Sequence, residues 1–463
     1  MVTKPFIGDW MDASEIYRKW SEENVEKPEK LYKRCDLPKW IDESPLVMIY
    51  PVKGTHDTGD MTPNEYYPYK NTLPLVDKFS EKTDSKIMPL LMHWEGTAPW
   101  ATPYVWPPYG GEDELKGFVD ALHDKGHFAG VYCSGIGWTT YSYLNPECDF
   151  SDRYDESLIC RTPDGTIKQS KTIGPPIREG YDMCPVEDKV SEMVSEEVQK
   201  ISKTGIDYAQ YFDQNLGGNA SFCYARDHAH PPAPGKWMND AMIKIYDKTN
   251  KDLKDAESKM VIGCECAAAE PFISRLPVND LRYNAAFYFG KPVPAYSYIF
   301  HEYINNFMGN QVTVARTLDL ANNPHCLLFR MGYSIAAGDM LSVTLGAGGK
   351  INWGWGTSWD IEYPDQENLF TFIKNTNTER IEKKEFLRYG KMIKPKKLEG
   401  TKKFAINHST GRTMEYPSLL TTRWIAPDGK EAQIIVNYLP EAQSFTVDGK
   451  KMEIAPLSVV WID

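Results

Sequence analysis

Short apolar runs alternate with amphipathic segments along most of the chain, from residue 46 to about residue 395. Runs of this length predict strands, and they lie at 46–52, 87–94, 128–134, 207–213, 260–267 and, more weakly, at 293–300 and 340–345. Segments with apolar residues at helical spacing lie between several of them, at 112–126, 186–205 and 237–258. The alternation predicts repeated βα units built around a parallel sheet.

A (β/α)8 TIM barrel over residues 46–395 accounts for this pattern better than an open sheet, because no Gly-rich phosphate turn follows the first predicted strand. Two connections, 139–187 and 214–236, are too long to be plain loops. The motif PDGT at 163–166 predicts a hairpin turn within the first of them. Insertions that follow barrel strands lie over the carboxyl ends of the strands, so both are expected to border a substrate cleft.

The two ends of the chain depart from the central pattern. Residues 1–45 contain an aromatic helical segment, which we expect to pack on the barrel. Residues 396–463 consist of short alternating runs with Asp-Gly turns at 428–429 and 448–449, which predict a small antiparallel β-sandwich domain. The expected fold class is therefore α/β, a TIM barrel followed by a small C-terminal β domain.

The composition is rich in aromatic residues. The 463 residues include 13 Trp, 27 Tyr and 18 Phe, although the mean hydropathy is −0.49, so many rings must lie beside polar groups. The formal net charge of −12 argues against a surface that follows nucleic-acid phosphates. The nine cysteines are odd in number and spread along the chain, which favours reduced core thiols over a disulfide framework.

No targeting or membrane segment is evident in the sequence. The N-terminus lacks the basic region and apolar run of a secretory signal, and no apolar stretch approaches the ~20 residues that span a bilayer. We therefore expect a soluble protein without a membrane partner. The compartment is unknown, since a cytoplasmic protein and a secreted or periplasmic one that has lost its signal would present the same sequence. The oligomeric state is also unknown.

Two neighbouring predicted strands end in carboxylates. Asp213 closes the first, Glu265 lies near the end of the second, and Glu270 follows just past it. The reacting groups of a βα barrel lie at the carboxyl ends of its strands. Because adjacent strands are about 4.8 Å apart, the carboxylates can reach the separation of about 5–5.5 Å of a retaining glycosidase or the wider gap of an inverting one. The alternative is that they are structural partners of arginines or backbone groups.

Aromatic and polar residues gather after the same strands and in the long loops. A pyranose ring has an apolar CH face and a polar rim, so a carbohydrate site needs aromatic platforms bordered by hydrogen-bonding groups. The candidate substrate-binding residues are His93, Trp94, Glu95, Tyr132, Gln214, His228, His230, Glu270, His301 and Trp353. Their clustering predicts an oligosaccharide or glycoside as the substrate.

Metal and cofactor motifs are weak. Cys223, His228 and His230 have the spacing C-x4-H-x-H, which does not match a structural zinc pattern and has no second Cys or His pair beside it, so substrate contact is favoured. His56 is single, which argues against metal-activated water, and the sequence has no Walker motif, nucleophile elbow or Rossmann turn. Lys53 could form a Schiff base but is expected to be solvated. We therefore expect no metal and no cofactor.

Five motifs carry a family resemblance. They are WMDASEIYRKW, HWEG, YFDQ, CYARDHAHPPAPGKW and CECAAAEPF, within residues 6–390. They resemble bacterial glycosidase-like barrel proteins of poorly characterised function, which are distantly similar to endo-α-N-acetylgalactosaminidases and melibiase-type α-galactosidases. The resemblance implies that Asp213 is a nucleophile and that a carboxylate on a later strand is the acid/base, for which we assign Glu265, with Glu270 in reserve.

The function implied by this resemblance is a retaining glycoside hydrolase. It would act on α-linked galactose or N-acetylgalactosamine-like glycosides by double displacement with two carboxylates. A non-catalytic carbohydrate-binding barrel protein and a metal-dependent hydrolase are the alternatives.

Overall fold

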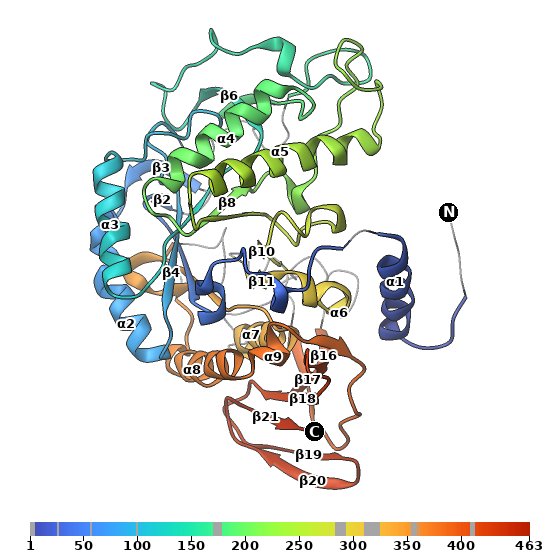
Figure 1. The fold of residues 1–463 in the computed structure, drawn as a ribbon. Coiled ribbons are helices and arrows are strands. Elements are labelled where there is room, and N and C mark those ends of the chain that lie inside the picture. The colour runs from blue at the N-terminus through green and yellow to red at the C-terminus, as the bar shows by residue number, and fades with distance from the viewer. Residues whose placement is uncertain are drawn as a thin grey trace. The chain divides into compact units, whose positions relative to one another are not determined.

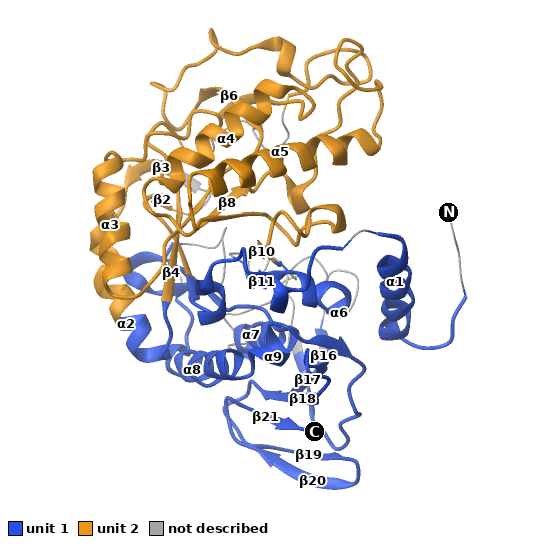
Figure 2. Cartoon of the chain, in the orientation of Figure 1, with its two compact units in different colours: residues 1–47, 78–86, 281–463 blue, residues 48–77, 87–280 orange. Residues whose placement is uncertain are grey.

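The computed structural model describes residues 5–25, 27–55, 58–98, 101–169, 178–282, 293–309, 325–352, 359–360, 362–407 and 413–463. The chain divides into two compact units, which Figure 2 draws in different colours. Unit 1 comprises residues 1–47, 78–86 and 281–463, and unit 2 comprises residues 48–77 and 87–280. Two residues singled out from the sequence, His56 and Trp353, lie outside the described residues.

A parallel sheet lies at the centre of unit 2 (Figure 1). Within unit 2, the strands of this sheet are, in their order across it, β1 (Leu46–Pro51, whose first residues belong to unit 1), β4 (Ile87–Met92), β5 (Gly130–Tyr132), β8 (Tyr208–Phe212) and β9 (Val261–Cys264). A further strand, β10 (Val278–Asp280), joins β9 through a parallel bridge between Glu265 and Asp280. All residues of these strands are buried, as in parallel sheets that are covered on both faces. The strands predicted between residues 46 and 267 are confirmed.

The helices of unit 2 follow its strands in the predicted alternation. They are α2 (Leu73–Thr83, which continues into unit 1), α3 (Glu112–Asp124), α4 (Asp188–Ser202) and α5 (Lys236–Asp255). Helix α3 buries the apolar face that the sequence predicts, from Leu115 to Leu122. Phe212 of β8 packs on Tyr246 of α5 with ring centroids 4.8 Å apart, so α5 covers this strand.

The connections after the strands of unit 2 carry additional structure. In the 139–187 insertion, β6 (Gly137–Ser142) pairs antiparallel with β7 (Arg178–Asp182). A bridge between Arg161 and Ile167 closes the predicted PDGT hairpin. The 214–236 loop contains one 3-10 turn, η5 (Leu216–Gly218), and is otherwise irregular up to α5. A hairpin of β2 (Lys53–Thr55) and β3 (Thr58–Pro63) follows β1.

Unit 1 begins with helix α1 (Trp10–Asn24), which Asp9 caps. It packs against α6 (Ala295–Phe300), where the Trp10 and Tyr298 rings have centroids 5.6 Å apart and Arg18 Nη1 donates to the Tyr298 carbonyl at 2.6 Å. The strand predicted at 293–300 is therefore wrong. Its aromatic residues favour a strand, but Tyr296 and Phe300 lie one helical turn apart and contact each other at 5.1 Å.

The remaining elements of unit 1 up to residue 387 are β11 (Asn305–Phe307), α7 (His325–Ala337), β12 (Ser342–Leu345), β13 (Ile351–Asn352), α8 (Gln366–Glu382) and α9 (Lys384–Leu387). The weak strand prediction at 340–345 is confirmed by β12. A parallel bridge joins Phe307 of β11 to Met340, just before β12. In the described part of the chain, 3-10 turns also occur as η1 (Leu31–Lys33), η2 (Lys39–Glu43), η3 (Tyr69–Thr72), η4 (Glu156–Leu158), η6 (Glu270–Phe272), η8 (His301–Tyr303) and η9 (Ala347–Gly349).

The C-terminal part of unit 1 is antiparallel β structure, as predicted. Its strands are β14 (Lys391–Ile393), β15 (Lys403–Asn407), β16 (Thr413–Pro417), β17 (Leu419–Ile425), β18 (Glu431–Asn437), β19 (Gln443–Val447), β20 (Lys450–Ile454) and β21 (Ser458–Ile462). A four-stranded sheet has the order β14-β17-β18-β21, and the other strands form the hairpins β15-β16 and β19-β20. The two Asp-Gly turns join β17 to β18 and β19 to β20, as predicted. The domain boundary at 395–396 and the β-sandwich form stay predictions.

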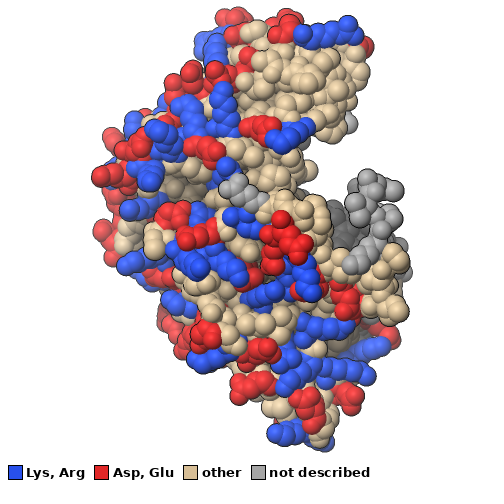
Figure 3. Space-filling model, turned by 45° about the vertical axis from the view of Figure 1, so that its right-hand side comes forward, with Lys and Arg blue, Asp and Glu red and all other residues tan. Residues whose placement is uncertain are grey.

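The surface and the helices give two further facts about the class of protein. On the face drawn in Figure 3, Lys and Arg side chains are interspersed with Asp and Glu side chains, unlike the continuous basic band that follows nucleic-acid phosphates. Among the described residues, each helix is too short or too polar to cross a membrane.

Candidate active site

Asp213 lies directly after β8 and is 3% exposed. Each of its carboxylate oxygens accepts a hydrogen bond: the Tyr132 hydroxyl donates to Oδ1, and Gln214 Nε2 donates to Oδ2 at 2.8 Å. Tyr132 ends β5, the strand beside β8, and is itself buried. The structure therefore brings together three of the residues singled out from the sequence, with a hydroxyl and an amide holding the plane of one buried carboxylate.

Glu265 lies at the matching position on the next strand. Phe212 of β8 pairs with Cys264 of β9, so Asp213 and Glu265 each follow a paired residue at the carboxyl end of neighbouring strands. Glu265 is half-buried, and its backbone carbonyl accepts from the Gly217 amide at 2.7 Å. Glu270, also half-buried, begins η6, and the Ala269 amide beside it donates to the Gly217 carbonyl at 2.8 Å. The loop after Asp213 is thus tied to the segment that carries both glutamates.

One buried carboxylate in this part of the sheet was missed by the sequence analysis. Asp280 is fully buried at the end of β10, next to Glu265 in the sheet, and its Oδ2 accepts from Gln210 Nε2 at 3.4 Å. The strand β10 has three residues, which is too short for apolar periodicity to reveal it. Its residues are Val, Asn and Asp, so no apolar run in the sequence marks Asp280 as the end of a strand.

Trp94 follows β4 and is fully buried. Its Nε1 donates to the Tyr132 carbonyl at 2.8 Å, and its ring packs edge-on against Trp106 with centroids 6.4 Å apart. The ring is fully buried in this structure, and substrate contact by Trp94 stays a prediction. Trp94 supports the strand end that carries Tyr132, whose hydroxyl meets Asp213.

The two residues that flank Trp94 in the sequence, His93 and Glu95, are buried and contact Lys53. Lys53 is 3% exposed, so the expectation of a solvated lysine is wrong. Its ammonium donates to the Glu95 carbonyl oxygen, and its own carbonyl contacts His93 Nδ1 at 3.0 Å. Burial lowers the pKa of Lys53, an effect that the Glu95 carboxylate opposes. Burial also lowers the pKa of Arg178 to about 9, again opposed by Glu95. His93 and Glu95 are thus buried within a charged network at the ends of β1 and β4.

His228 and His230 lie in the 214–236 loop, and the structure places Cys184 and Cys223 beside them. Ligand atoms of these four residues all lie within 4.8 Å of one another. The sequence near Cys223 contains no second cysteine, but the folded chain brings Cys184 next to it. The ring nitrogens of the two histidines contact cysteine sulfurs and a backbone carbonyl. Substrate contact by these histidines stays a prediction.

His301 belongs to unit 1, where it is buried against Trp424 with ring centroids 4.5 Å apart. Its Nδ1 lies 2.9 Å from the Gly390 carbonyl and its Nε2 lies 3.1 Å from the Leu387 carbonyl. Burial lowers the pKa of His301 to about 4. Both ring nitrogens therefore lie beside backbone carbonyls, and the sugar contact expected of His301 stays a prediction.

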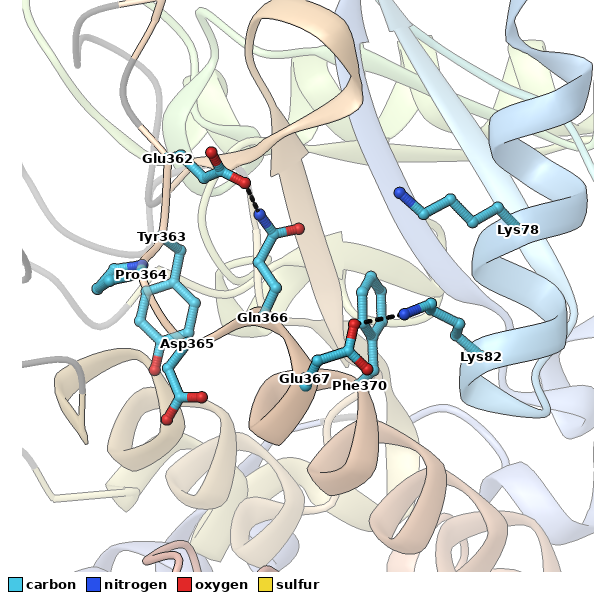
Figure 4. Close-up of a pocket in the computed structure, with 9 residues that line it drawn as sticks. All are labelled: Lys78, Lys82, Glu362, Tyr363, Pro364, Asp365, Gln366, Glu367 and Phe370. Carbon is cyan, nitrogen blue, oxygen red and sulfur yellow. Dashed lines mark hydrogen bonds and ion pairs between the residues drawn. The ribbon is translucent and has the colours of Figure 1, made fainter.

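A surface pocket of about 600 Å³ lies in unit 1 beside the start of α8 (Figure 4). Its charged lining includes Lys78, Lys82, Glu362 and Glu367, and Lys82 forms an ion pair with Glu367. The residues that line it include none of those singled out from the sequence. We therefore base the candidate active site on the strand ends of unit 2, where the buried carboxylate and its donors meet.

Several solved structures similar to this chain are glycoside hydrolases. The α-N-acetylgalactosaminidase NagBb from Bifidobacterium bifidum in its GalNAc complex is 15% identical with a TM-score of 0.60, and the match covers 96% of this chain and 63% of that one. The cyclic α-maltosyl-(1→6)-maltose hydrolase from Arthrobacter globiformis is 11% identical with a TM-score of 0.53, over 92% and 99% of the two chains. A GH31 family sulfoquinovosidase from E. rectale is also 11% identical with a TM-score of 0.53, over 81% and 51%.

These likenesses show the fold, and they confirm the distant resemblance to glycosidases. The chain spans about 63% of the length of the NagBb chain. A comparison with curated protein sequences found no match. Residues 1–310 match the family described as "Domain of unknown function (DUF6259)". Since this match extends over more than half of the 463 residues, the chain belongs to the DUF6259 family.

Proposed function

We propose that this chain is a retaining glycoside hydrolase that acts on α-linked glycosides, with Asp213 as nucleophile and Glu265 as acid/base. The observation that carries the proposal is the environment of Asp213. Its buried carboxylate accepts hydrogen bonds from Tyr132 and Gln214, on a strand that pairs with the strand of Glu265. Donated hydrogen bonds stabilise a carboxylate anion and fix its plane, which suits a nucleophile at the carboxyl end of a strand.

The proposed reaction has two steps. In the first, Asp213 attacks the anomeric carbon while the glycosidic C–O bond breaks, and Glu265 gives its proton to the departing oxygen. In the second, water attacks the same carbon, Glu265 takes a proton from the water, and the bond to Asp213 breaks. The two displacements return the original anomeric configuration and require no cofactor.

The fold proposed with this mechanism is a (β/α)8 barrel. Unit 2 supplies β1, β4, β5, β8, β9 and β10, and we propose that β11 and β12 of unit 1 supply the other two strands. In such a barrel the carboxyl ends of all strands face one side. The 139–187 and 214–236 connections, which follow β5 and β8, would then border the cleft.

The proposed sugar is galactose or N-acetylgalactosamine in α linkage. Support comes from the similarity to NagBb, an α-N-acetylgalactosaminidase whose structures include a GalNAc complex. The other similar enzymes act on different sugars, so the preference must be measured. A panel of aryl α- and β-glycosides of galactose, N-acetylgalactosamine, glucose and sulfoquinovose compares these alternatives directly.

The decisive experiment is NMR detection of the first-formed anomer from the best α-glycoside of the panel. An α product before mutarotation supports double displacement, and a β product overturns it. Glu265→Gln and Glu270→Gln form a matched pair at the carboxyl end of β9. We expect Glu265→Gln to lose the general-acid limb of the pH profile on a glycoside with a poor leaving group. On an activated aryl glycoside, whose leaving group needs no proton, added azide should restore its rate by replacing water in the second step. Glu270→Gln should keep the normal profile. The reverse result moves the role to Glu270. Sugar binding without turnover across the panel would favour the non-catalytic alternative.

A further inference from the structure

A cluster of sulfur and imidazole groups lies outside the proposed catalytic residues. The Cys/His cluster consists of Cys184, Cys223, His228 and His230, of which His228 is half-buried and the others are buried. Cys184 belongs to the 139–187 insertion, and the other three residues belong to the 214–236 loop. The cluster therefore joins two segments that follow different strands, β5 and β8.

The spacing of its atoms matches a tetrahedral metal site. Cys184 Sγ lies 3.4 Å from His230 Nε2, and Cys223 Sγ lies 3.5 Å from His228 Nδ1. Zinc binds thiolate at about 2.3 Å and imidazole at about 2.0–2.1 Å, so a sulfur and a nitrogen on one tetrahedral zinc lie about 3.6 Å apart. Two thiolates with two imidazoles form a donor set that structural zinc sites use.

The His230 ring is held in the form that a metal ligand requires. Its Nδ1 lies 2.8 Å from the Pro231 carbonyl oxygen, and since a carbonyl only accepts, Nδ1 carries the proton. The lone pair of Nε2 then points towards Cys184. Trp237 stacks on the ring with centroids 3.7 Å apart and planes 6° from parallel, which fixes its orientation. Metal-binding histidines are usually oriented in this way by a hydrogen bond from the other ring nitrogen.

A backbone amide points at the sulfur of Cys223. Cys223 Sγ accepts a hydrogen bond from the Arg161 amide at 3.4 Å. Amide donors stabilise thiolate sulfur, the form of cysteine that binds metal.

A third sulfur lies beside the cluster. Cys160 packs with Cys184 and Cys223 in one cluster of buried residues. Cys160 is not one of the four residues whose ligand atoms all lie within 4.8 Å of one another. All three cysteines are free thiols in this structure. The main chemical alternative to metal binding is a disulfide between two of them.

We propose that Cys184, Cys223, His228 and His230 bind one structural Zn²⁺ ion, which fastens the 214–236 loop to the 139–187 insertion. Four protein ligands complete a tetrahedral shell and leave no position for an activated water, so the ion stabilises structure and does not take part in hydrolysis. The two segments already meet beside the cluster, where the Tyr224 amide donates to the Arg161 carbonyl at 2.9 Å. The zinc proposal is independent of the proposed glycosidase activity.

The first test is the metal content of the full chain, expressed in zinc-supplemented medium and desalted. We expect about one zinc per chain by elemental mass spectrometry. After exchange with Co²⁺ we expect the strong visible bands of tetrahedral cobalt together with thiolate-to-cobalt charge transfer. Absence of zinc and of the cobalt spectrum would overturn the proposal. So would a disulfide between cluster cysteines, detected by mass spectrometry of the unreduced protein.

The second test compares variants with matched controls. Cys223→Ser and His228→Gln each remove a proposed ligand and are expected to lower zinc content at least about tenfold after dialysis against a competing chelator. Cys160→Ser removes the neighbouring buried sulfur, Cys35→Ser removes an exposed one, and both are expected to keep the metal. Loss of zinc in Cys160→Ser with retention in His228→Gln would refute the ligand set. If the ligand variants do not fold, the cobalt spectrum of the unaltered chain still decides.

Discussion

Asp213→Asn is the most informative single substitution in this protein. It keeps the shape of the side chain but removes the charge of a buried group that accepts bonds from Tyr132 and Gln214. A hydrogen bond to a charged group contributes about 1.5–3 kcal/mol and a neutral one about 0.5–1.5 kcal/mol. The Tyr132 hydroxyl can rotate and the Gln214 amide can flip to match asparagine, so two charged bonds become two neutral ones at a cost of about 2 kcal/mol. Part of that cost is offset because the neutral asparagine is less costly to bury than a charged carboxylate.

The effect on catalysis should be far larger than the effect on stability. Removing the nucleophile is expected to lower kcat/KM on an aryl α-glycoside by at least about 10³-fold, or about 4 kcal/mol of activation free energy. The assays are release of the aryl group and urea unfolding followed by circular dichroism. In Asp213→Gly, added azide should restore turnover and yield the β-glycosyl azide. A folded Asp213→Asn protein with kcat/KM within tenfold of the unaltered chain would refute the assignment.

Asp207 provides a matched control on the same strand. It precedes β8, so it lies at the opposite end of the strand from Asp213, and its Oδ2 accepts from the Ala129 amide at 2.9 Å. Asp207→Asn should cost stability of similar size and leave kcat/KM unchanged. Equal losses of activity in both variants would show that Asp213 acts through the strand and not on the substrate.

Three further predictions concern stability. Trp94→Phe leaves the buried Tyr132 carbonyl without its donor and opens a small cavity, so the free energy of unfolding should fall by about 2–4 kcal/mol in urea titrations; a change below about 0.5 kcal/mol would contradict this packing. The hydrogen bond to Asp207 raises the pKa of His123, so its stabilisation is present below pH about 6.5 and is lost as pH rises through the folded-state pKa; His123→Gln should flatten that part of the stability curve, and an unchanged curve would exclude the pair as its cause. Burial raises the pKa of Glu197 from 4.5 to about 8, so this side chain increasingly destabilises the fold as pH rises between those values; Glu197→Gln should be more stable than the unaltered chain at pH 8 and equal to it at pH 4, and a loss of stability at pH 8 would overturn the sign.

The alternation of strands and helices is determined by the sequence alone. Apolar periodicity is a local property, because a strand buried on both faces needs a continuous apolar run and a covering helix needs one apolar face. The segments now seen as β1, β4, β5, β8 and β9 and the helices α3, α4 and α5 were therefore predictable. So were the Asp-Gly turns, whose backbone geometry depends on the glycine itself. The prominence of Asp213 follows from the same local rule, since an acid that ends a buried strand is costly unless it has partners.

Only the tertiary structure decided which residues become partners. At 293–300 helical contacts with α1 and between aromatic side chains prevailed over strand propensity. The pairing of β8 with β9 has an irregular register between Ala209 and Phe212. The side of the sheet on which Asp213 lies therefore cannot be obtained by counting alternate residues along the strand. Lys53, a polar residue in sequence, is buried because a carbonyl at the end of β4 receives its ammonium.

The Cys/His cluster shows the same limit most clearly. Its C-x4-H-x-H spacing is uninformative in the sequence, because the cysteine that completes the set lies in another insertion, 39 positions before Cys223. A metal site depends on distances between ligand atoms and not on spacing along the chain. Tyr132 and Asp213 likewise lie 81 positions apart and meet only because β5 and β8 are neighbours in the sheet. Local patterns determined the elements of this protein, while long-range backbone pairing determined the neighbours of each reactive group.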